Sequence, residues 1–159
     1  MPSIAVDTPL GFLTVIEEHG SITSLSSTGH DECQETELLR LARDQLLAYF
    51  TGRLQRFDLP IAPAGSLFQR AVWNAMLRIP YGQTRAYGAL AAELSNTARS
   101  VGQACGTNPI PIIIPCHRVV GATGKMIGYS GFRGTATKEF LLGLEGAIAQ
   151  PLPFDIARY

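Results

Sequence analysis

Cysteine is scarce in this chain of 159 residues: there are three, and none of them stands at the short spacing that metal ligands require. That scarcity argues against a disulfide scaffold and a zinc module, and it fits a reducing compartment such as the cytoplasm. The nearest approach to a metal cluster is His30 with Cys33, a pair that chance alone explains. We therefore expect no metal site.

Long apolar runs are missing as well. No stretch approaches the roughly 20 apolar residues that cross a bilayer. The N-terminus lacks the charged segment and apolar run that are typical of a signal peptide. A chain of 159 residues with 46% hydrophobic side chains suits one or two small globular domains with a buried core.

The chain has no net charge, with 13 basic and 13 acidic side chains, but the charges are unevenly spread. Residues 1–66 carry nine acidic and four basic side chains, a net charge of −5. Residues 67–150 carry three acidic and eight basic ones, a net charge of +5. A basic second half suits a polyanionic partner, although segments this short also acquire such a difference by chance.

The first third of the chain predicts a small α/β layer. Segments of alternating polarity are separated by turn residues, and a leucine-rich helical face ends at Gly52. We expect strands at Ser3–Thr8, Phe12–Glu17 and Ser21–Ser26 and a helix at Glu35–Phe50. No residue of this domain, which we place at 1–54, is a candidate for chemistry.

The remainder predicts a mostly helical domain at 67–148, after a Pro- and Gly-rich linker at 55–66 and before a tail at 149–159. The fold class is thus α/β (α+β). The expected helices are Leu67–Leu77, Arg85–Leu94, Thr97–Cys105 and Ala136–Leu144. Thr84 is the expected cap of the second helix, and Asn96 or Thr97 that of the third. These two helices with their tight turn predict a winged helix-turn-helix-like motif.

The outer face of Thr97–Cys105 carries small side chains and a single arginine. Helices that read the major groove present several long polar side chains to the bases. A small-residue face favours docking in the narrower minor groove without sequence preference. A helix pair that binds no nucleic acid is the alternative.

The segment Ile110-Pro111-Ile112-Ile113-Ile114-Pro115-Cys116-His117-Arg118-Val119-Val120 is the most unusual in the chain. Its isoleucines predict a buried strand bounded by prolines, with a thiol and an imidazole at its end. A thiol attacks only as the thiolate, so a base must take its proton. Neighbours on a strand face opposite ways, so we expect a water to bridge Cys116 and His117. An inert, buried Cys116 is the other interpretation.

Glu145 ends the last predicted helix, where the helix dipole disfavours a carboxylate. A partner would offset that cost, and we expect it to be His117. Simple exposure of Glu145 is the alternative.

Pro115-Cys116-His117-Arg118-Val119 resembles the acceptor-site signature of the O6-alkylguanine-DNA alkyltransferases. Asn108–Ile114, Gly128-Tyr129-Ser130-Gly131 and Phe68-Gln69-Arg70-Ala71-Val72-Trp73 resemble further motifs of that family. They occur in the same order and spacing over about residues 67–146. Several ordered motifs are far more specific than one short pattern.

This resemblance implies direct repair of DNA. An alkyl group would pass from O6 of guanine, or O4 of thymine, to the Cys116 thiolate after the damaged base has left the helix. The thioether is stable, so each molecule would react once, without a cofactor. The implied partner is double-stranded DNA that contains O6-alkylguanine. The protein would be a monomer whose N-terminal domain acts as a scaffold, and cooperative binding on DNA stays open.

The resemblance also implies roles for single residues. The catalytic set is Cys116 as nucleophile, His117 as base through a water, Glu145 to orient His117, Tyr129 to donate to the base, and Asn108 to brace the turn. The substrate set is Tyr129, Ser130 with its N–H at O6, Cys105 on the pocket wall, and the carbonyl groups of Cys116 and Val119. On DNA, Tyr87 would crowd the target phosphate and Arg99 would enter the base stack. The remaining DNA contacts would be Phe68, Gln69, Thr97, Ala98, Ser100 and Gly102.

The segment Phe132–Thr137 is about two residues longer than the usual family loop, which affects the lip of the pocket. Three other functions compete. A non-catalytic protein that binds alkylated DNA would lack the thiol of Cys116, and a helix-turn-helix regulator would present a longer polar face. A cysteine hydrolase would need an oxyanion site, of which the sequence shows no sign.

Overall fold

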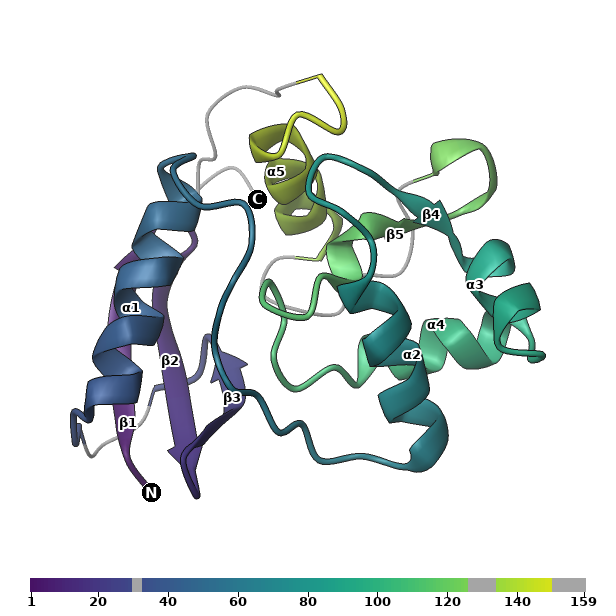
Figure 1. Ribbon diagram of the computed structural model, residues 1–159. Coiled ribbons are helices and arrows are strands. Elements are labelled where there is room, and N and C mark those ends of the chain that lie inside the picture. Colours follow the sequence, from purple (N-terminus) through teal and green to yellow (C-terminus); the bar gives the residue numbers. More distant parts are fainter. Residues whose placement is uncertain (30–32, 126–133, 150–159) are drawn as a thin grey trace.

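The computed structural model describes residues 1–29, 33–125 and 134–149 (Figure 1). The N-terminal half is an antiparallel sheet in the order β1–β2–β3, formed by Ser3–Thr8, Gly11–Glu18 and Ser21–Ser26. Helix α1, Glu37–Phe50, packs on β1 and β2. The predicted bounds of β1 and β3 are confirmed. Helix α1 begins two residues later than predicted, because Thr36 is its N-cap and accepts the N–H of Leu39 at 3.1 Å.

The linker is bound along the edge of this sheet. Its Ile61 forms a parallel bridge with Ile22 of β3. The N–H of Ile22 donates to the carbonyl of Pro60 at 2.8 Å, and the N–H of Ala62 donates to that of Ile22 at 2.9 Å. The side chain of Gln45 on α1 bonds both the N–H and the carbonyl of Asp58. The segment that the sequence presents as a linker is therefore held in a fixed path by the first half of the chain. The domain bounds that we placed around it stay a prediction.

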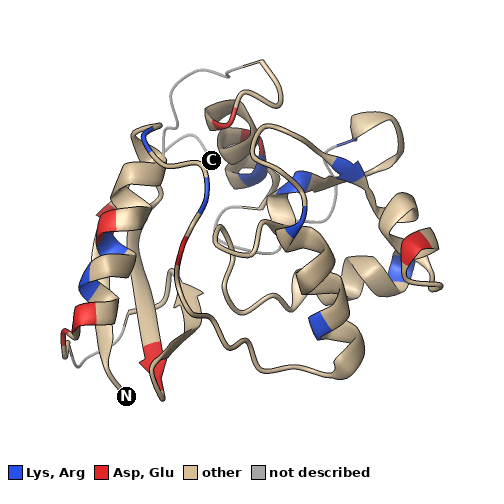
Figure 2. Cartoon of the chain, viewed as in Figure 1, with Lys and Arg blue, Asp and Glu red and all other residues tan. Residues whose placement is uncertain are grey.

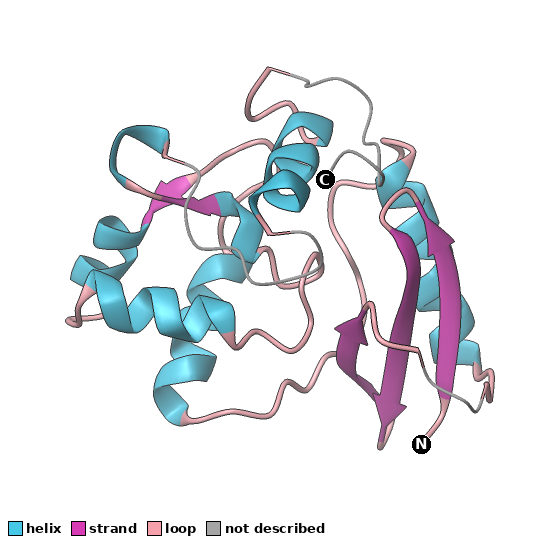
Figure 3. Cartoon of the chain, turned by 180° about the vertical axis from the view of Figure 1, so that it is seen from behind, coloured by secondary structure: helices cyan, strands magenta, loops and turns pink. Residues whose placement is uncertain are grey.

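The second half is mostly helical (Figure 3). Its helices are α2 (Leu67–Leu77), α3 (Tyr87–Glu93), α4 (Ala98–Gly106) and α5 (Thr135–Leu144), with single 3-10 turns η1 (Cys116–Arg118) and η2 (Ala122–Gly124). Strands β4 (Arg85–Ala86) and β5 (Val119–Val120) pair in parallel. Trp73 of α2 is buried, and its indole N–H donates to the carbonyl of Ala104 on α4 at 2.9 Å. This bond joins α2 to the helix pair.

Two predicted elements are wrong. The helix placed at Arg85–Leu94 begins only at Tyr87, because Arg85 and Ala86 pair with β5 instead, and Thr84 does not cap it. The strand predicted for Ile112–Ile114, between Pro111 and Pro115, is instead part of a turn: the N–H of Ile114 donates to the carbonyl of Ile110 at 2.9 Å. Prolines lack the N–H that a sheet ladder needs, and Pro109 and Pro111 leave too few donors for one. The segment is nonetheless buried, as predicted.

No helix within the described part of the chain is long and apolar enough to span a membrane.

Gly65 lies against the ring of Trp73. A Cβ atom added at Gly65 would lie 2.6 Å from Cη2 of Trp73 and 2.9 Å from Oε1 of Gln69. Trp73 is fully buried, so its ring has no space to move. We expect Gly65→Ala to lower the free energy of unfolding by about 1–3 kcal/mol, as overpacking commonly does. Urea unfolding followed by tryptophan fluorescence measures this.

Gly88 on α3 is the matched control, because a Cβ added there would meet no atom within 4 Å. Gly88→Ala should leave stability unchanged or raise it by up to about 1 kcal/mol, since Ala favours helix. Equal stabilities for the two variants would contradict the contact between Gly65 and Trp73.

Candidate active site

Cys116 is the first residue of η1, directly after the turn at Ile110–Ile114. Its N–H donates to the carbonyl of Ile114 at 2.8 Å, and the residue is only 6% exposed. Asn108 fixes the turn from both ends: its Nδ2 donates to the carbonyl of Ile114 and its Oδ1 accepts the N–H of Ile110, each at 2.9 Å. A tight turn, rather than a strand, thus places the sulfur.

His117 and Glu145 are in contact, and His117 is the partner that we expected for Glu145. Nε2 of His117 lies 2.7 Å from Oε2 of Glu145, and both side chains are fully buried. Burial lowers the pKa of His117 more than the neighbouring Glu145 raises it. We infer a neutral imidazole whose Nε2–H donates to the carboxylate. Its Nδ1 then faces the other way as an acceptor, and it has no hydrogen-bond partner among the described residues.

The carboxylate of Glu145 has further partners. The Nε and Nη2 atoms of Arg118 donate to it at 2.8 and 3.1 Å, and the hydroxyl of Tyr49 donates to Oε2 at 2.6 Å. Burial by itself raises the pKa of Glu145. Hydrogen bonds and charges from His117 and Arg118 outweigh that effect and lower it to about 2. Glu145 is therefore an ionised carboxylate within the core.

Tyr49 was not among the predicted site residues. It belongs to α1, in the half of the chain for which we expected no part in the chemistry. Its ring is completely buried, and burial raises the pKa of its hydroxyl, so it remains a donor. A tyrosine within a leucine-rich helical face was a usable signal, because a buried hydroxyl needs a partner. The sequence alone gave no indication that this partner is Glu145.

Lys138 of α5 is a second residue that the sequence analysis missed. Its side chain is fully buried, and Nζ lies 3.3 Å from the hydroxyl of Tyr87 and 5.4 Å from the centre of that ring. Burial lowers the pKa of Lys138, while the nearby thiols of Cys116 and Cys105 raise it. A lysine is seldom buried without a function or a partner. A basic side chain therefore lies within electrostatic reach of the Cys116 sulfur.

Cys105 lies on α4 close to the same group. Its Sγ is 3.5 Å from Sδ of Met76, and burial followed by the proximity of Cys116 raises the pKa of its thiol to about 12. Such a thiol stays protonated at neutral pH and does not compete as a nucleophile.

The helix pair presents α4 outward, with Thr97, Ala98 and Arg99 exposed. Thr97 is the N-cap of α4 and accepts the N–H of Ser100 at 3.1 Å, one of the two caps predicted. Arg99 forms no hydrogen bond or ion pair with any residue that the structure describes. Ser100 and Gly102 are half-buried on the same helix.

Other residues predicted to contact DNA or the substrate are buried, half-buried or already hydrogen-bonded. Tyr87 is only 7% exposed and its hydroxyl is engaged by Lys138. Phe68 is half-buried, and the amide of Gln69 bonds the N–H of Ser66 and the hydroxyl of Thr107. Gln69 therefore has a structural part as a helix cap. Val119 is fully buried beside Cys116.

Some predicted residues lie outside the described ones, namely Tyr129, Ser130, His30 and the beginning of the Phe132–Thr137 segment. Among the described residues, no group of three or more acidic, histidine or cysteine side chains is placed to hold a metal ion.

Acidic and basic residues occur in both halves of the chain (Figure 2). The acidic excess of the first half is partly neutralised, because Arg43 of α1 pairs with Glu35 at 3.5 Å and with Asp44 at 3.6 Å. In the second half, Glu93 binds both Arg78 and Arg85. Arg70, Arg99 and Lys125 are exposed cations of the second half.

Two family models together match most of the chain. The DNA binding domain of 6-O-methylguanine DNA methyltransferase matches residues 67–147, and the ribonuclease-like domain of the same enzyme matches residues 4–63. This chain belongs to that methyltransferase family. The resemblance found at residues 67–146 is thereby confirmed, and the match now includes the N-terminal half.

Relatives of this methyltransferase cover nearly its whole length. The methylated-DNA–protein-cysteine methyltransferase of Mycolicibacterium paratuberculosis is 44% identical, with 88% of this chain and 89% of the relative covered. The constitutive enzyme of Bacillus subtilis is 41% identical over 87% of this chain and 92% of the relative.

Solved structures agree with the fold. Mycobacterium tuberculosis OGT in complex with DNA matches with a TM-score of 0.83 and 42% identity, over 96% of this chain and 97% of the other. An O6-methylguanine DNA methyltransferase from Methanococcus jannaschii matches with a TM-score of 0.65 and 27% identity, over 91% and 93%. The predicted fold class, a small antiparallel sheet domain followed by a helical DNA-binding domain, is confirmed.

The buried pairing of Glu145 predicts a loss of stability in acid. Its pKa is about 2 in the folded chain against an ordinary value of 4.5, so it stabilises the fold fully above pH 4.5. That contribution, on the order of 3 kcal/mol, is lost as the pH falls from 4.5 towards 2. Urea unfolding between pH 7 and 3 should show a steep slope below pH 5.

Glu145→Gln should flatten that slope, although the variant is less stable at pH 7. Glu139→Gln on the same helix is the control and should follow the unmodified chain, because Glu139 forms no ion pair with a described residue. A slope that Glu145→Gln leaves unchanged would contradict the assignment.

Proposed function

We propose that this chain repairs alkylated DNA by direct reversal. It is a methylated-DNA–protein-cysteine S-methyltransferase that moves a methyl or larger alkyl group from O6 of guanine, or O4 of thymine, to the thiolate of Cys116. The observation that carries this function is local: Cys116 stands directly before His117, whose imidazole contacts the Glu145 carboxylate at 2.7 Å. Family membership over both halves of the chain supports it.

The reaction is a displacement at the alkyl carbon. The Cys116 sulfur forms the new S–C bond, the C–O6 bond breaks, and its electron pair stays on the guanine, which a proton then neutralises. His117 takes the thiol proton at Nδ1, through a water, and Glu145 stabilises the imidazolium that forms. The geometry suits this role, because Nε2 is held by Glu145 while Nδ1 is left as an acceptor. No group in this scheme restores the thiol, so each molecule acts once.

Lys138 supports the same step by electrostatics. A cation near a thiol favours the thiolate, and burial strengthens the effect because no water screens it. The bond from Lys138 to Tyr87 also fixes the tyrosine that begins α3. We assign Lys138 as a positioning residue that stabilises the Cys116 thiolate and holds Tyr87 beside it.

DNA that contains O6-alkylguanine is the partner, and α4 is the surface that meets it. The target atom lies within the duplex, so the nucleotide must rotate out before it reacts. Exposed Arg99 would fill the vacated place in the stack, and the small residues Ala98 and Gly102 allow close approach to the minor groove. Tyr129 and Ser130 would complete the guanine pocket, with Cys105 on its wall. The monomer suffices for this chemistry.

The alternative functions agree less well with the residues of the site and of α4. A non-catalytic protein that binds alkylated DNA has no need of a thiol beside a buried His–Glu pair. A helix-turn-helix regulator would need more than the short face of α4. We place the protein in the cytoplasm, where a reducing environment would preserve its three free cysteines, Cys33, Cys105 and Cys116.

Transfer to Cys116 predicts a permanent gain in mass. After incubation with duplex DNA that carries O6-methylguanine, intact-mass spectrometry should show one added methyl group per molecule. Cys116→Ser should gain none, because a serine hydroxyl is not ionised at neutral pH. Cys33→Ser, which replaces an exposed thiol of the N-terminal half, should react as the unmodified chain does. Repeated turnover, or methylation of the Cys116→Ser variant, would refute the proposal.

The role of Lys138 predicts a change in the pH dependence of transfer. Lys138→Met keeps the length and apolar stem of the side chain but removes the cation, so the thiolate should form only at higher pH. We expect the single-turnover rate at neutral pH to fall about tenfold or more, with its midpoint moved upwards by about one pH unit. Lys125→Met, which removes an exposed cation, should leave both unchanged. A lower rate with an unmoved midpoint would indicate a merely structural role.

A further inference from the structure

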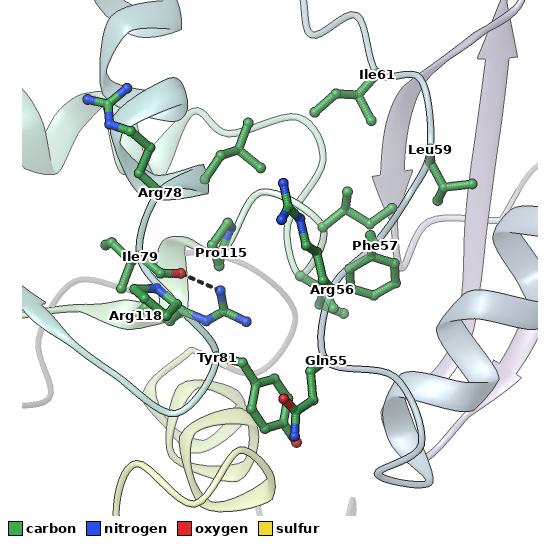
Figure 4. A pocket seen from close by; sticks show the side chains of 14 residues that line it. Gln55, Arg56, Phe57, Leu59, Ile61, Arg78, Ile79, Tyr81, Pro115 and Arg118 are labelled. Atoms are coloured by element: carbon green, nitrogen blue, oxygen red, sulfur yellow. Dashed lines mark hydrogen bonds between the residues drawn. The ribbon is translucent and has the colours of Figure 1, made fainter.

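A pocket of about 730 Å³ lies between the linker and residues 110–120, which we call the acceptor segment (Figure 4). The linker contributes Arg56 and Phe57, and the acceptor segment contributes Ile113, Pro115 and Arg118. Its volume lies within the range of about 300–1,000 Å³ that is typical of small-molecule sites. Among the described residues that line it, neither Cys116 nor His117 is found. The pocket is therefore separate from the acceptor thiol.

The charge of this pocket is one-sided. Three arginines line it, Arg56, Arg78 and Arg118, and none of the lining residues is acidic. Arg78 is neutralised outside the pocket by Glu93 at 3.1 Å. Arg56 is exposed and forms no hydrogen bond or ion pair with a described residue. The pocket therefore contains an uncompensated positive charge.

Arg118 has donors to spare although it is 93% buried, with a relative exposure of 7%. Its Nε and Nη2 donate to Glu145 and its Nη1 donates to the carbonyl of Ile79 at 2.7 Å. A guanidinium has more N–H groups than these three bonds use, so one N–H on each Nη has no partner among the described residues. In Figure 4 the guanidinium group of Arg118 points towards the linker, that of Arg56 points away from Tyr81, and the ring of Phe57 lies beside the Arg56 side chain.

We propose that this pocket binds a small organic anion. Its phosphate or carboxylate group would lie between Arg56 and Arg118, where two guanidinium groups offer donors in the fixed geometry that such anions prefer. Its apolar or aromatic body would pack on Phe57 and on the Ile113–Pro115 side of the acceptor segment. This site goes beyond the repair reaction and does not depend on it, because binding requires no alkylated DNA.

Isothermal titration of the full chain with naphthyl phosphate tests the site, in a buffer without phosphate. Arg56→Gln is the informative variant, because Arg56 is exposed and outside the Glu145 cluster, whereas a change at Arg118 would disturb that cluster. We expect Arg56→Gln to weaken binding at least fivefold. Arg53→Gln, which changes an exposed arginine shortly before the linker and outside the pocket, should change it less than twofold.

Three further measurements can overturn the proposal. Naphthol, which lacks the anionic group, should bind at least tenfold more weakly than naphthyl phosphate. Inorganic phosphate, which lacks the apolar body, should also bind at least tenfold more weakly. Equal binding of either probe would refute the combined site, as would unchanged affinity in Arg56→Gln. Displacement of naphthyl phosphate by an undamaged DNA duplex would show that the arginines bind the DNA backbone instead. Methyl transfer by Arg56→Gln, measured in parallel, should stay unchanged, so failure of the site is distinguishable from failure of the repair function.

Discussion

The whole site depends on one buried carboxylate. Glu145 receives hydrogen bonds from Tyr49 of α1 and from Arg118 of η1, and it contacts His117 of the same turn, while itself ending α5. Three segments that are far apart in sequence therefore meet at two oxygen atoms. An ion in such a place is costly, because burial of a charge is repaid only when its partners are well placed. The fold must therefore be complete before the carboxylate is satisfied, which couples the N-terminal half to the acceptor turn.

The same carboxylate explains how the His117 imidazole is held in one orientation and still remains uncharged. Arg118 neutralises Glu145, so the imidazole can remain neutral in a fully buried position. A neutral imidazole oriented through Nε2 is the state in which Nδ1 can accept a proton. If Arg118 were absent, the unpaired carboxylate would favour the protonated form of His117, which could no longer act as the base that we propose. Arg118, whose place in the sequence suggested only a neighbour of the acceptor, thus sets the protonation state of the pair.

Local features of the fold could be predicted, and long-range contacts could not. The strand bounds of β1 and β3 followed from alternation, and the cap at Thr97 followed from a local hydrogen bond that its residue type favours. Cys116, His117 and Glu145 could be named from the motif and from the cost of a carboxylate at a helix end. Tyr49 and Glu145 are separated by 96 positions, and no local pattern links them. Lys138 was missed for a similar reason, since a lysine within a short helix usually indicates solvent and not burial.

The acceptor segment shows where composition misleads. Three successive isoleucines favour a strand, yet Ile112 has a φ of 75°, a left-handed conformation that β-branched residues rarely adopt. Such strain costs about 1–3 kcal/mol and persists only when the surroundings impose it. Here Asn108 closes the turn, the edge of β3 donates to the carbonyl of Pro109 at 3.0 Å, and Ile110, Ile112 and Ile114 are buried. Burial of the isoleucines therefore stabilises the turn, although their β-branched side chains disfavour its backbone conformation. The result is a sulfur fixed by a rigid, packed turn, and the proposed displacement depends on that position because the attacking atom must lie in line with the bond that breaks.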